Sequence, residues 1–557
     1  MNQMIKVGFF IFLISIIGLS GTKAQMKPHH QYALTPPMGW NSWNCFKRHI
    51  SESQIKEIAD LMASRGFLDA GYKYLVIDDG WAAGRDKNGV VYADSVKFPN
   101  GIKKLVEYVH SKGLKFGIYT SPGKTTCAGY VGSLGYEQKD VNTYAGWGVD
   151  FIKLDWCSGG DDERIAIAAR WRKVLDNVKR PMVLSINFGQ EAYNWASNYA
   201  NMWRTTTDIS ACWDLPITET GGLPCSVLGV VDQQPGLERY QSPGSWNDPD
   251  MMQVGNGSLT ESENRSHFSM WAILGAPLMM GNDLRKMTSE INALMINREV
   301  IAVNQDSSGY QGRKIFDSGE DVRRTGNNYG QEVWVKKLIS PGEYAIVLLN
   351  RSDYKNYMKI DWSSLGLHTR GVAVRDLWKH QDLGVYDDYY AEMIAPHDVL
   401  FLKVKGAITK EITELFPQIN DSIVTEAEKG LLGRSVKSSF YRGFSGNGYV
   451  QFNTEAQERY IRLVVNAPKE QMYLAGIRYC NVTGNPVKLH LNLDNKENEL
   501  VCQTSVISGN AWDSKAEWKT TYIYLKLKQG LNVIKVSSFD VYVPLVDCLI
   551  VKPMNKQ

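Results

Sequence analysis

The sequence has little net charge and carries no metal-ligand motif. Its 557 residues have a formal charge of only +3 and show no long basic run, so binding to nucleic acid is not expected. The nine histidines are scattered without the spacing of a metal site, which gives no indication of a catalytic metal. Long repeats and low-complexity tracts are also missing. These features suit an ordinary globular protein, and the length predicts several domains.

The first 24 residues read as a signal peptide. Lys6 precedes an apolar stretch from Val7 to Leu19, and small residues around Ala24 offer a cleavage site before Gln25. The apolar stretch is short for a membrane span, so a retained anchor is the weaker alternative and no span is expected after cleavage. We therefore expect a secreted or periplasmic protein.

The cysteines fit an oxidising compartment, since all eight follow the predicted signal peptide. Cys127 and Cys157 lie near the ends of two predicted strands and could pair. Cys212 and Cys225 flank one loop and are the second candidate pair. Sequence alone does not assign partners to the other four, which are Cys45, Cys480, Cys502 and Cys548.

Strand and helix patterns alternate from Met38 to Arg298. Eight strands are predicted, at 38–43, 74–77, 115–119, 151–154, 182–187, 202–208, 245–250 and 277–280. Helical segments separate them, as between Ser51 and Arg65, where apolar residues recur on one face. Eight strands separated by helices predict a parallel, closed (β/α)8 barrel. An open doubly wound sheet is the alternative, but no glycine-rich phosphate turn follows the first strand.

The pattern changes near Gln311, and strand sequence without helical periodicity follows. The predicted organisation is a signal peptide at 1–24, a (β/α)8 barrel at 30–310, an antiparallel β-sandwich at 311–405, a linker at 406–422 and a second all-β, jelly-roll-like domain at 423–555. Strands separated by Gly, Asn, Asp and Pro turns support the assignment of both β-domains.

Polar and aromatic side chains stand where the barrel strands are predicted to end. These residues are Trp43, Asp78, Asp79, Tyr119, Asp155, Asn187, Asp208 and Asp250. In a barrel these positions meet at one mouth, where active sites lie. A carboxylate beside a buried strand is costly to desolvate. A helix cap or a core salt bridge can explain one such aspartate, but not the whole set.

Two of these carboxylates suit retaining glycoside hydrolysis. Asp155 and Asp208 end the fourth and sixth strands, and the reaction needs a nucleophile and an acid/base about 5 to 5.5 Å apart. Lys153 precedes Asp155 by two residues, so it shares the same strand side and is expected to keep Asp155 ionised. Arg204 precedes Asp208 by an even number of residues. The spacing predicts a carbohydrate-cleaving site.

Several stretches resemble glycoside hydrolase family 27, the family of α-galactosidases and α-N-acetylgalactosaminidases. They are, in family order, 36–43, 77–81, 153–157, Trp203-Arg204 with Asp208, 246–251 and 303–306. The resemblance implies a retaining mechanism without metal or other cofactor, with Asp155 as nucleophile and Asp208 as acid/base. It further implies a sugar-binding set of Trp43, Asp78, Asp79, Tyr119, Lys153 and Arg204, to which the strand ends add Asn187 and Asp250. A Cys127–Cys157 disulfide beside the pocket is also implied.

The expected reaction is release of terminal α-linked D-galactose from oligo- or polysaccharides through a covalent glycosyl-aspartate. Asp78 and Asp79 favour a sugar with galacto-type 4- and 6-hydroxyls. The stretch around Asn187 differs from many members in the region that faces the 2-position of the sugar. β-L-Arabinopyranosidase and α-N-acetylgalactosaminidase activity are therefore alternatives. A non-catalytic sugar-binding protein is a further alternative, which the presence of both carboxylates opposes.

The C-terminal domain resembles carbohydrate-binding module family 35 or its relative family 6. The carrying stretches are 425–428, 446–450 and 546–547. The resemblance implies that Glu426, Glu428 and Asp547 hold a structural Ca²⁺, an ion that prefers oxygen ligands, and ordinary surface acids are the alternative. Four aromatic residues are candidates for stacking on a sugar: Tyr441, Trp512, Trp518 and Tyr542.

Overall fold

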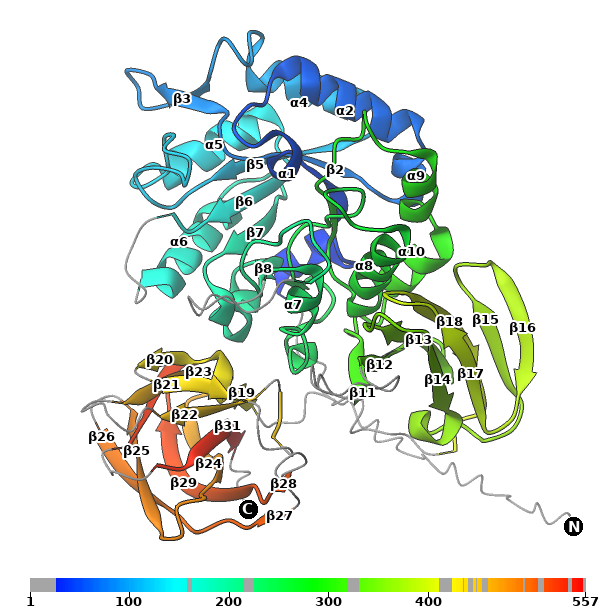
Figure 1. Ribbon diagram of the computed structural model, residues 1–557. Coiled ribbons are helices and arrows are strands. Elements are labelled where there is room, and N and C mark those ends of the chain that lie inside the picture. Colours follow the sequence, from blue (N-terminus) through cyan, green and yellow to red (C-terminus); the bar gives the residue numbers. More distant parts are fainter. Residues whose placement is uncertain are drawn as a thin grey trace, which may run out of the picture.

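Figure 1 shows the computed structural model, which places a barrel, a β-sandwich and a C-terminal β-domain in succession along the chain. It describes residues 27–157, 163–214, 225–317, 330–409, 423–433, 435–438, 444–446, 448–452, 459–493, 496–508, 515–538 and 543–553. The predicted signal peptide lies outside these residues. None of the helices within these residues is both long enough and apolar enough to cross a membrane.

Eight parallel strands form the first sheet, in the order β10-β1-β2-β5-β6-β7-β8-β9. Their bounds are β1 Met38–Asn41, β2 Tyr74–Ile77, β5 Lys115–Thr120, β6 Phe151–Asp155, β7 Val183–Asn187, β8 Met202–Arg204, β9 Trp246–Asp248 and β10 Leu278–Met280. A parallel bridge between Met252, just after β9, and Met280 joins the two ends of this order. The predicted (β/α)8 barrel is confirmed.

Helices cover the outside of the barrel (Figure 1). They are α1 Trp43–Phe46, α2 Glu52–Ser64, α3 Phe67–Ala70, α4 Gly101–Ser111, α5 Glu137–Trp147, α6 Arg164–Asp176, α7 Val227–Val231, α8 Glu261–Leu274, α9 Ser289–Met295 and α10 Arg298–Asn304, with the 3-10 helix η1 at Pro28–Ala33. Local chemistry sets their ends: Thr260 and Glu263 form a capping box at the start of α8, and Gly275 ends that helix with a φ of +63°.

The helical layer is thin beside β7 and β8. In the described residues, β7 is followed by two short 3-10 helices, η3 (Gln190–Asn194) and η4 (Ala196–Asn198), and β8 by α7 and the 3-10 helix η5 (Glu238–Tyr240). The alternation of strands and helices predicts one short helix over 191–199, and the two 3-10 helices replace it because Trp195 adopts a φ of −136° that interrupts a helix. The hairpin of β3 (Ala82–Arg85) and β4 (Val91–Ala93) is not predicted from the sequence pattern.

The strands carry apolar side chains in the barrel lumen and polar ones at its mouth. Alternate residues of a strand share one side, so Phe151 of β6 lies in the lumen and is followed by Lys153 and Asp155. Met202 of β8 is followed in the same way by Arg204. Phe151 and Met202 belong to one buried cluster with lumen residues of the other strands. Each strand thus leads from the apolar lumen into a charged mouth.

The second domain is antiparallel. Its main sheet has the order β11-β12-β13-β18-β15-β16, and a second sheet pairs β14 with β17. The bounds are β11 Arg313–Asp317, β12 Gln331–Lys337, β13 Glu343–Asn350, β14 Asn356–Asp361, β15 Val372–Asp376, β16 Gln381–Tyr386, β17 Tyr389–Ile394 and β18 Val399–Lys405, with the 3-10 helix η6 at Trp362–Leu365. The two sheets enclose Trp362, Ile346 and Leu402 in a common core.

The C-terminal domain is a sandwich of two antiparallel sheets, as the fold prediction expected. One has the order β21-β22-β31-β24-β29 with β19 paired to β31, the other β20-β23-β30-β25-β26, and β27 pairs with β28. The bounds are β19 Ile423–Glu426, η7 Ala427–Lys429, β20 Leu431–Gly433, β21 Ser435–Ser438, β22 Tyr449–Phe452, β23 Tyr460–Ala467, β24 Gln471–Cys480, β25 Val487–Leu493, β26 Lys496–Cys502, β27 Ile507–Ser508, β28 Lys515–Ala516, β29 Lys519–Leu527, β30 Gly530–Ser537 and β31 Leu545–Pro553.

Candidate functional site

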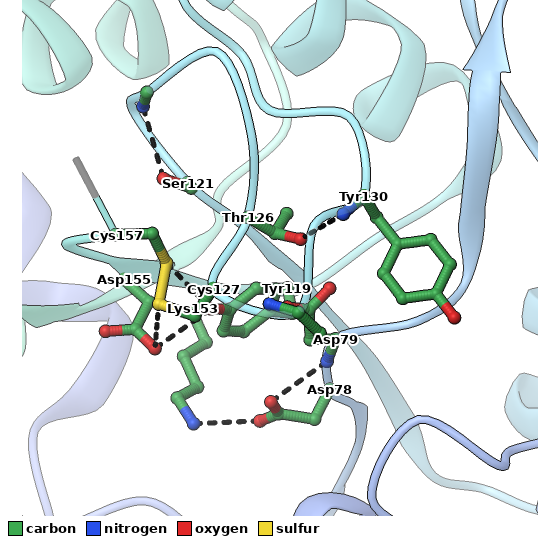
Figure 2. The surroundings of a disulfide bond; sticks show 12 residues. Asp78, Asp79, Tyr119, Ser121, Thr126, Cys127, Tyr130, Lys153, Asp155 and Cys157 are labelled. Carbon is green, nitrogen blue, oxygen red and sulfur yellow. Dashed lines mark hydrogen bonds and ion pairs between the residues drawn. A yellow bond between two sulfur atoms is a disulfide. The ribbon is translucent and has the colours of Figure 1, made fainter.

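The mouth of the barrel is built around Asp78, which ends β2. Its Oδ2 accepts hydrogen bonds from Lys153 Nζ and from Asn41 Nδ2, each at 2.8 Å. Figure 2 shows Lys153 of β6 reaching across to Asp78. Asp78 is 2% exposed, and a buried carboxylate needs such partners. Side chains from the adjacent strand β1 and from β6, which lies beyond β5 in the sheet, therefore fix the position of Asp78.

Asp155 lies at the end of β6, within reach of Tyr119 of β5. The Tyr119 hydroxyl donates a hydrogen bond of 2.9 Å to Asp155 Oδ2. Burial raises the pKa of Asp155 above its usual value, and Lys153 and the Tyr119 hydroxyl oppose that rise. Lys153 lowers the pKa of Asp155, as expected, but it does not bring that pKa down to the usual value. The ammonium group bonds to Asp78, and its effect on Asp155 is outweighed by burial.

A disulfide joins Cys127 to Cys157 beside this pair, with the two Cα atoms 4.8 Å apart (Figure 2). Cys127 Sγ lies 3.9 Å from Asp155 Oδ2. The bond ties the loop between β5 and α5 to the end of β6. In that loop the Ala128 N–H donates to Asp79 Oδ2 at 2.8 Å, so the loop held by the disulfide orients Asp79.

The expected bond between Cys212 and Cys225 is not formed, and both are free cysteines. Their backbones do run side by side, since the Val227 N–H donates to the Cys212 carbonyl at 3.0 Å. The Cys225 Sγ instead lies 3.3 Å from Ser210 Oγ. Sequence spacing located the neighbouring backbones but not the direction of the side chains.

Asp208 lies beyond the end of β8, opposite Arg204. The Arg204 guanidinium is 3.2 Å from Asp208 Oδ1. Desolvation raises the pKa of Asp208, but Arg204 and Lys153 outweigh it and hold that pKa below the usual value. The Asp208 side chain is 80% exposed whereas that of Arg204 is 5% exposed. The acid group is therefore open to a ligand, while the cation behind it is fixed.

Asp250 lies behind Arg204 rather than at the surface of the mouth. It is 4% exposed and contacts Arg204 Nη2 at 3.1 Å. Its Oδ2 accepts the Ile209 N–H at 2.9 Å, next to Asp208. Its backbone has a φ of +99°, a region that favours glycine. Its Oδ1 accepts the Met251 N–H at 2.7 Å, so both oxygens have protein partners that hold the side chain in place, and the contact of Asp250 with a substrate stays a prediction.

Asp248, at the end of β9, is a mouth residue that the sequence reasoning missed as a candidate. It is 7% exposed and pairs in register with Arg204. Burial raises its pKa to about 6, although Arg204 opposes this. A signal for it existed, since Asp248 belongs to the same 246–251 stretch that contains Asp250.

Trp43 and Asn187 complete the predicted set. Trp43 begins α1 and packs half-buried against the lumen cluster, with Lys47 Nζ 5.4 Å from its ring centre. Asn187 pairs in register with Asp155, and its carbonyl accepts the Trp156 N–H at 3.0 Å. Both residues therefore lie at the mouth with Asp155.

Of the four aromatic candidates in the C-terminal domain, Trp518 is the one within the described residues. Tyr441, Trp512 and Tyr542 lie outside the described residues. Trp518 packs against Tyr449, with 5.3 Å between ring centres. Stacking of Trp518 on a sugar is therefore not supported by its placement.

The mouth can perform acid–base chemistry on an uncharged, hydroxyl-rich ligand. Lys153 and Arg204 both act on Asp155 and on Asp208, so the two carboxylates share one electrostatic environment. Asp78 and Asp79 present oxygens that can accept hydroxyl protons. In the described residues, one group of three side chains brings possible metal-ligand atoms together, and it consists of Cys127, Asp155 and Cys157. The two cysteines of this group are joined in the disulfide.

Comparison with known proteins places the chain among sugar-cleaving enzymes. The family model described as Alpha galactosidase A matches residues 35–306, and that described as Alpha galactosidase C-terminal beta sandwich domain matches residues 328–404. Alpha-galactosidase A of Cellvibrio japonicus is 44% identical over 347 residues, which are 62% of this chain and 83% of the relative.

Two solved structures are similar to the same part of the chain. Alpha-galactosidase I of Mortierella vinacea has a TM-score of 0.63 and 34% identity, and covers 68% of this chain and 99% of its own. The α-galactosidase of Saccharomyces cerevisiae with raffinose has a TM-score of 0.62 and 27% identity, and covers 67% of this chain and 98% of its own.

Proposed function

Because the chain belongs to glycoside hydrolase family 27, the α-galactosidase family, we propose that its galactose-releasing activity runs through Asp155 and Asp208. The enzyme is a retaining α-galactosidase that needs no cofactor for catalysis. The observation that carries the assignment is the placement of Asp155 and Asp208 within the field of the same two cations, Lys153 and Arg204.

Asp155 is the proposed nucleophile. Its carboxylate attacks the anomeric carbon while Asp208 donates its proton to the leaving oxygen, which gives a glycosyl-aspartate intermediate. In the second step Asp208 removes a proton from water, and the water oxygen displaces Asp155 from the same carbon. Two inversions give overall retention. The Tyr119 hydroxyl orients Asp155 for attack through its 2.9 Å hydrogen bond.

The protonation states require substrate binding to act on Asp208. In the free enzyme Arg204 holds the pKa of Asp208 low, whereas the first step needs that group protonated. A sugar placed over the exposed side chain of Asp208 removes water from it, and loss of water favours the neutral acid. The bound substrate thus helps to prepare its own proton donor.

The proposed substrates are oligosaccharides that end in α-linked galactose, a class that includes raffinose, the ligand in the yeast structure. Asp78 and Asp79 are fixed by Lys153, Asn41 and the Ala128 N–H, so their free lone pairs are available for the sugar hydroxyls. Preorganised acceptors of this kind discriminate strongly against sugars that lack the matching hydroxyl.

The test is turnover of a panel of aryl glycosides by the wild type. We expect the α-galactoside to have a higher kcat/KM than the α-N-acetylgalactosaminide and the β-L-arabinopyranoside. A preference for either of the other two would overturn the substrate assignment.

The roles of the two aspartates are separated by leaving-group dependence. Asp155→Ala is expected to lose several orders of magnitude in kcat on every α-galactoside. Asp208→Ala is expected to lose far more on raffinose than on an aryl galactoside, because a phenolate with a low pKa leaves without a proton. Equal losses on both substrates for Asp208→Ala would contradict its role as the acid.

Export of the enzyme is a further part of the proposal. The apolar stretch from Val7 to Leu19 and the Cys127–Cys157 disulfide support a secreted or periplasmic location. The check is N-terminal sequencing of the protein recovered outside the cytoplasm, where we expect the chain to begin near Gln25. Recovery of the unprocessed chain in the cytoplasm alone would contradict export.

A further inference from the structure

The thin part of the barrel wall is the part that the C-terminal domain covers. Tyr193 of η3 and Tyr240 of η5 pack against each other there, with 4.6 Å between ring centres. Tyr193 is 2% exposed although no long helix lies outside it in the described residues. In Figure 1 the C-terminal domain lies on the side of the barrel that holds β7 and β8, whereas the second domain (β11 to β18) lies beside α8 and α10.

Polar contacts join the two domains at this place. The Tyr240 hydroxyl donates to the Val424 carbonyl of β19. Lys429 of η7 donates to the Pro235 carbonyl at 3.1 Å, and its Nζ is 5.3 Å from the centre of the Tyr193 ring. Burial lowers the pKa of Lys429 to about 8, against the effect of the nearby glutamates. A lysine desolvated in this way belongs to a closed interface rather than to a surface.

Close packing accompanies these bonds. A Cβ added to Gly236 would lie 3.3 Å from Gly446 Cα, which means that the two backbones nearly touch. Val464 and Leu531 of the C-terminal domain pack against the main hydrophobic core of the barrel. The contact therefore has an apolar centre and a polar border, as a stable interface requires.

Two of the three residues that resemblance assigns to calcium, Glu426 and Asp547, have protein partners, and Glu426 has one across this interface. Glu426 is fully buried, and its Oε1 is 3.0 Å from Arg239 Nη2 of the barrel. Its Oε2 accepts the Ser445 hydroxyl at 2.7 Å. Asp547 is also fully buried and is paired with Arg478 and with the Ser445 N–H.

This donor set does not fit a calcium ion. Calcium takes six to eight oxygens at 2.3 to 2.6 Å, so its carboxylates must converge on one point. Glu426, Glu428 and Asp547 are not among the converging groups found in the described part of the chain. Instead, a guanidinium group contacts one oxygen of Glu426 and one of Asp547, and it supplies positive charge beside each buried carboxylate.

We infer that the C-terminal domain is a fixed part of the barrel wall, and that Arg239 and Arg478 replace calcium as the cations at its carboxylates. Arg239 comes from the barrel and Glu426 from the C-terminal domain, so the ion pair that stands in for the metal also joins the domains. The interface is the surface beside β7 and β8, and its partner is the β19–η7 edge of the same chain.

Thermal unfolding of the full-length enzyme with excess EDTA and with millimolar Ca²⁺ tests whether arginine takes the place of calcium. We expect the same midpoint in both solutions. A calcium-dependent rise of several degrees, lost in Glu426→Gln, would overturn the inference.

The docking of the C-terminal domain on the barrel is tested by Arg239→Gln, with Lys104→Gln as the matched control. Lys104 forms an ion pair with Glu107 in which both side chains are exposed, so its loss should leave the midpoint nearly unchanged. Arg239→Gln leaves Glu426 buried without its partner and is expected to lower the midpoint by roughly 4 °C or more. Glu426→Gln combined with Arg239→Gln is expected to recover part of the loss.

Hydrogen exchange shows whether the effect lies at the interface. Arg239→Gln should speed exchange in residues 190–199 and 423–429, and leave residues 43–46 unchanged. If Arg239→Gln fails to fold, Arg239→Lys, which keeps the charge, replaces it in the experiment. Its midpoint and exchange rates should lie between those of the wild type and those expected for Arg239→Gln. A midpoint and an exchange pattern equal to those of the wild type would refute the docking role. Turnover of an aryl galactoside well below the midpoint should not change, so this result is independent of the catalytic assignment.

Discussion

At the residue scale, the mouth of the barrel is governed by two cations, Lys153 and Arg204, which contact some of its carboxylates and act on others from a distance. Lys153 bonds to Asp78 yet opposes the raised pKa of Asp155. Arg204 contacts Asp208 and Asp250 from a buried position. The protonation of any one aspartate therefore depends on groups that do not touch it, and single substitutions should shift pH profiles as well as rates.

Removal of the Tyr119 hydroxyl should shift the pH profile in a defined direction. That hydroxyl stabilises the ionised form of Asp155, so Tyr119→Phe should raise the pKa of Asp155 further. The nucleophile must be ionised, and the acid limb of kcat/KM should therefore move to higher pH. Tyr130→Phe is the control, since its hydroxyl contacts Lys97 and not the mouth. An acid limb at the same pH in wild type and Tyr119→Phe would count against Asp155 as the group that sets it.

The backbone of Asp250 gives a second prediction at this scale. Asp250→Ala and Asp250→Gly both remove the carboxylate that contacts Arg204 and the Ile209 N–H. Only glycine accepts a φ of +99° without strain. In denaturant unfolding, the alanine variant should therefore be less stable than the glycine variant by about 1 kcal/mol. Equal stability of the two would show that the backbone relaxes when the carboxylate is lost.

At the scale of elements, the loop between β5 and α5 connects a covalent bond to Asp79, a proposed sugar-binding residue. The Cys127–Cys157 disulfide anchors this loop, and the Ala128 N–H next to Cys127 bonds to Asp79. The loop carries no residue that would attract notice in sequence except the cysteine. Its importance comes from a backbone donor, which every residue type supplies.

Loss of this disulfide should weaken sugar binding more than it slows chemistry. In Cys127→Ser/Cys157→Ser the loop is freed, so Asp79 loses a fixed donor while Asp155 keeps Tyr119. We expect KM for an aryl α-galactoside to rise by roughly tenfold, the cost of one hydrogen bond to a charged group, with a smaller fall in kcat. A thiol reductant should produce the same change in the wild type and none in the double variant. A fall in kcat at constant KM would contradict this role of the loop.

The elements that the sequence predicts well are those whose burial follows from a local apolar pattern. β2 is a continuous apolar run followed by a carboxylate, and β6 is an apolar strand interrupted by Lys153 that ends in a carboxylate, so the pattern locates Asp78 and Asp155. In the 191–199 segment the alternating pattern predicts one helix, whereas the apolar residues serve two 3-10 turns covered by another domain. Its burial depends on residues more than 200 positions away, and a local pattern carries no such information.

The same limit applies to the arrangement of side chains within the site. Sequence spacing places Lys153 on the same strand side as Asp155, but an ammonium on a four-carbon stem can reach past β5 to the end of β2, where it bonds to Asp78. Asp250 carries the same signal as the other strand ends, and only its left-handed backbone turns it behind Arg204. Residue type and spacing select the candidates, whereas backbone geometry decides which of them face the ligand.

At the scale of the whole molecule, stability should depend on pH through the buried carboxylate Asp248. Its pKa is about 6 in the folded protein, against about 3.9 in an unfolded chain. Between these values the folded state binds the additional proton, so the free energy of unfolding falls as the pH rises from about 4 to 6. Over this window Asp248→Asn should show a weaker pH dependence than the wild type, by about 3 kcal/mol. Denaturant unfolding at pH 4, 5, 6 and 7 measures the difference, and parallel curves would contradict it.

The docked C-terminal domain also limits how this enzyme can work on a long saccharide. A module on a free tether raises the effective concentration of its ligand around the catalytic centre, within a volume set by the length of the tether. A domain whose β19–η7 edge is held by Arg239 and Tyr240 has no such volume to sample. A chain bound on it would be presented at one distance and in one orientation, so the spacing of galactose branches along that chain, rather than its concentration, would decide which branch reaches Asp155.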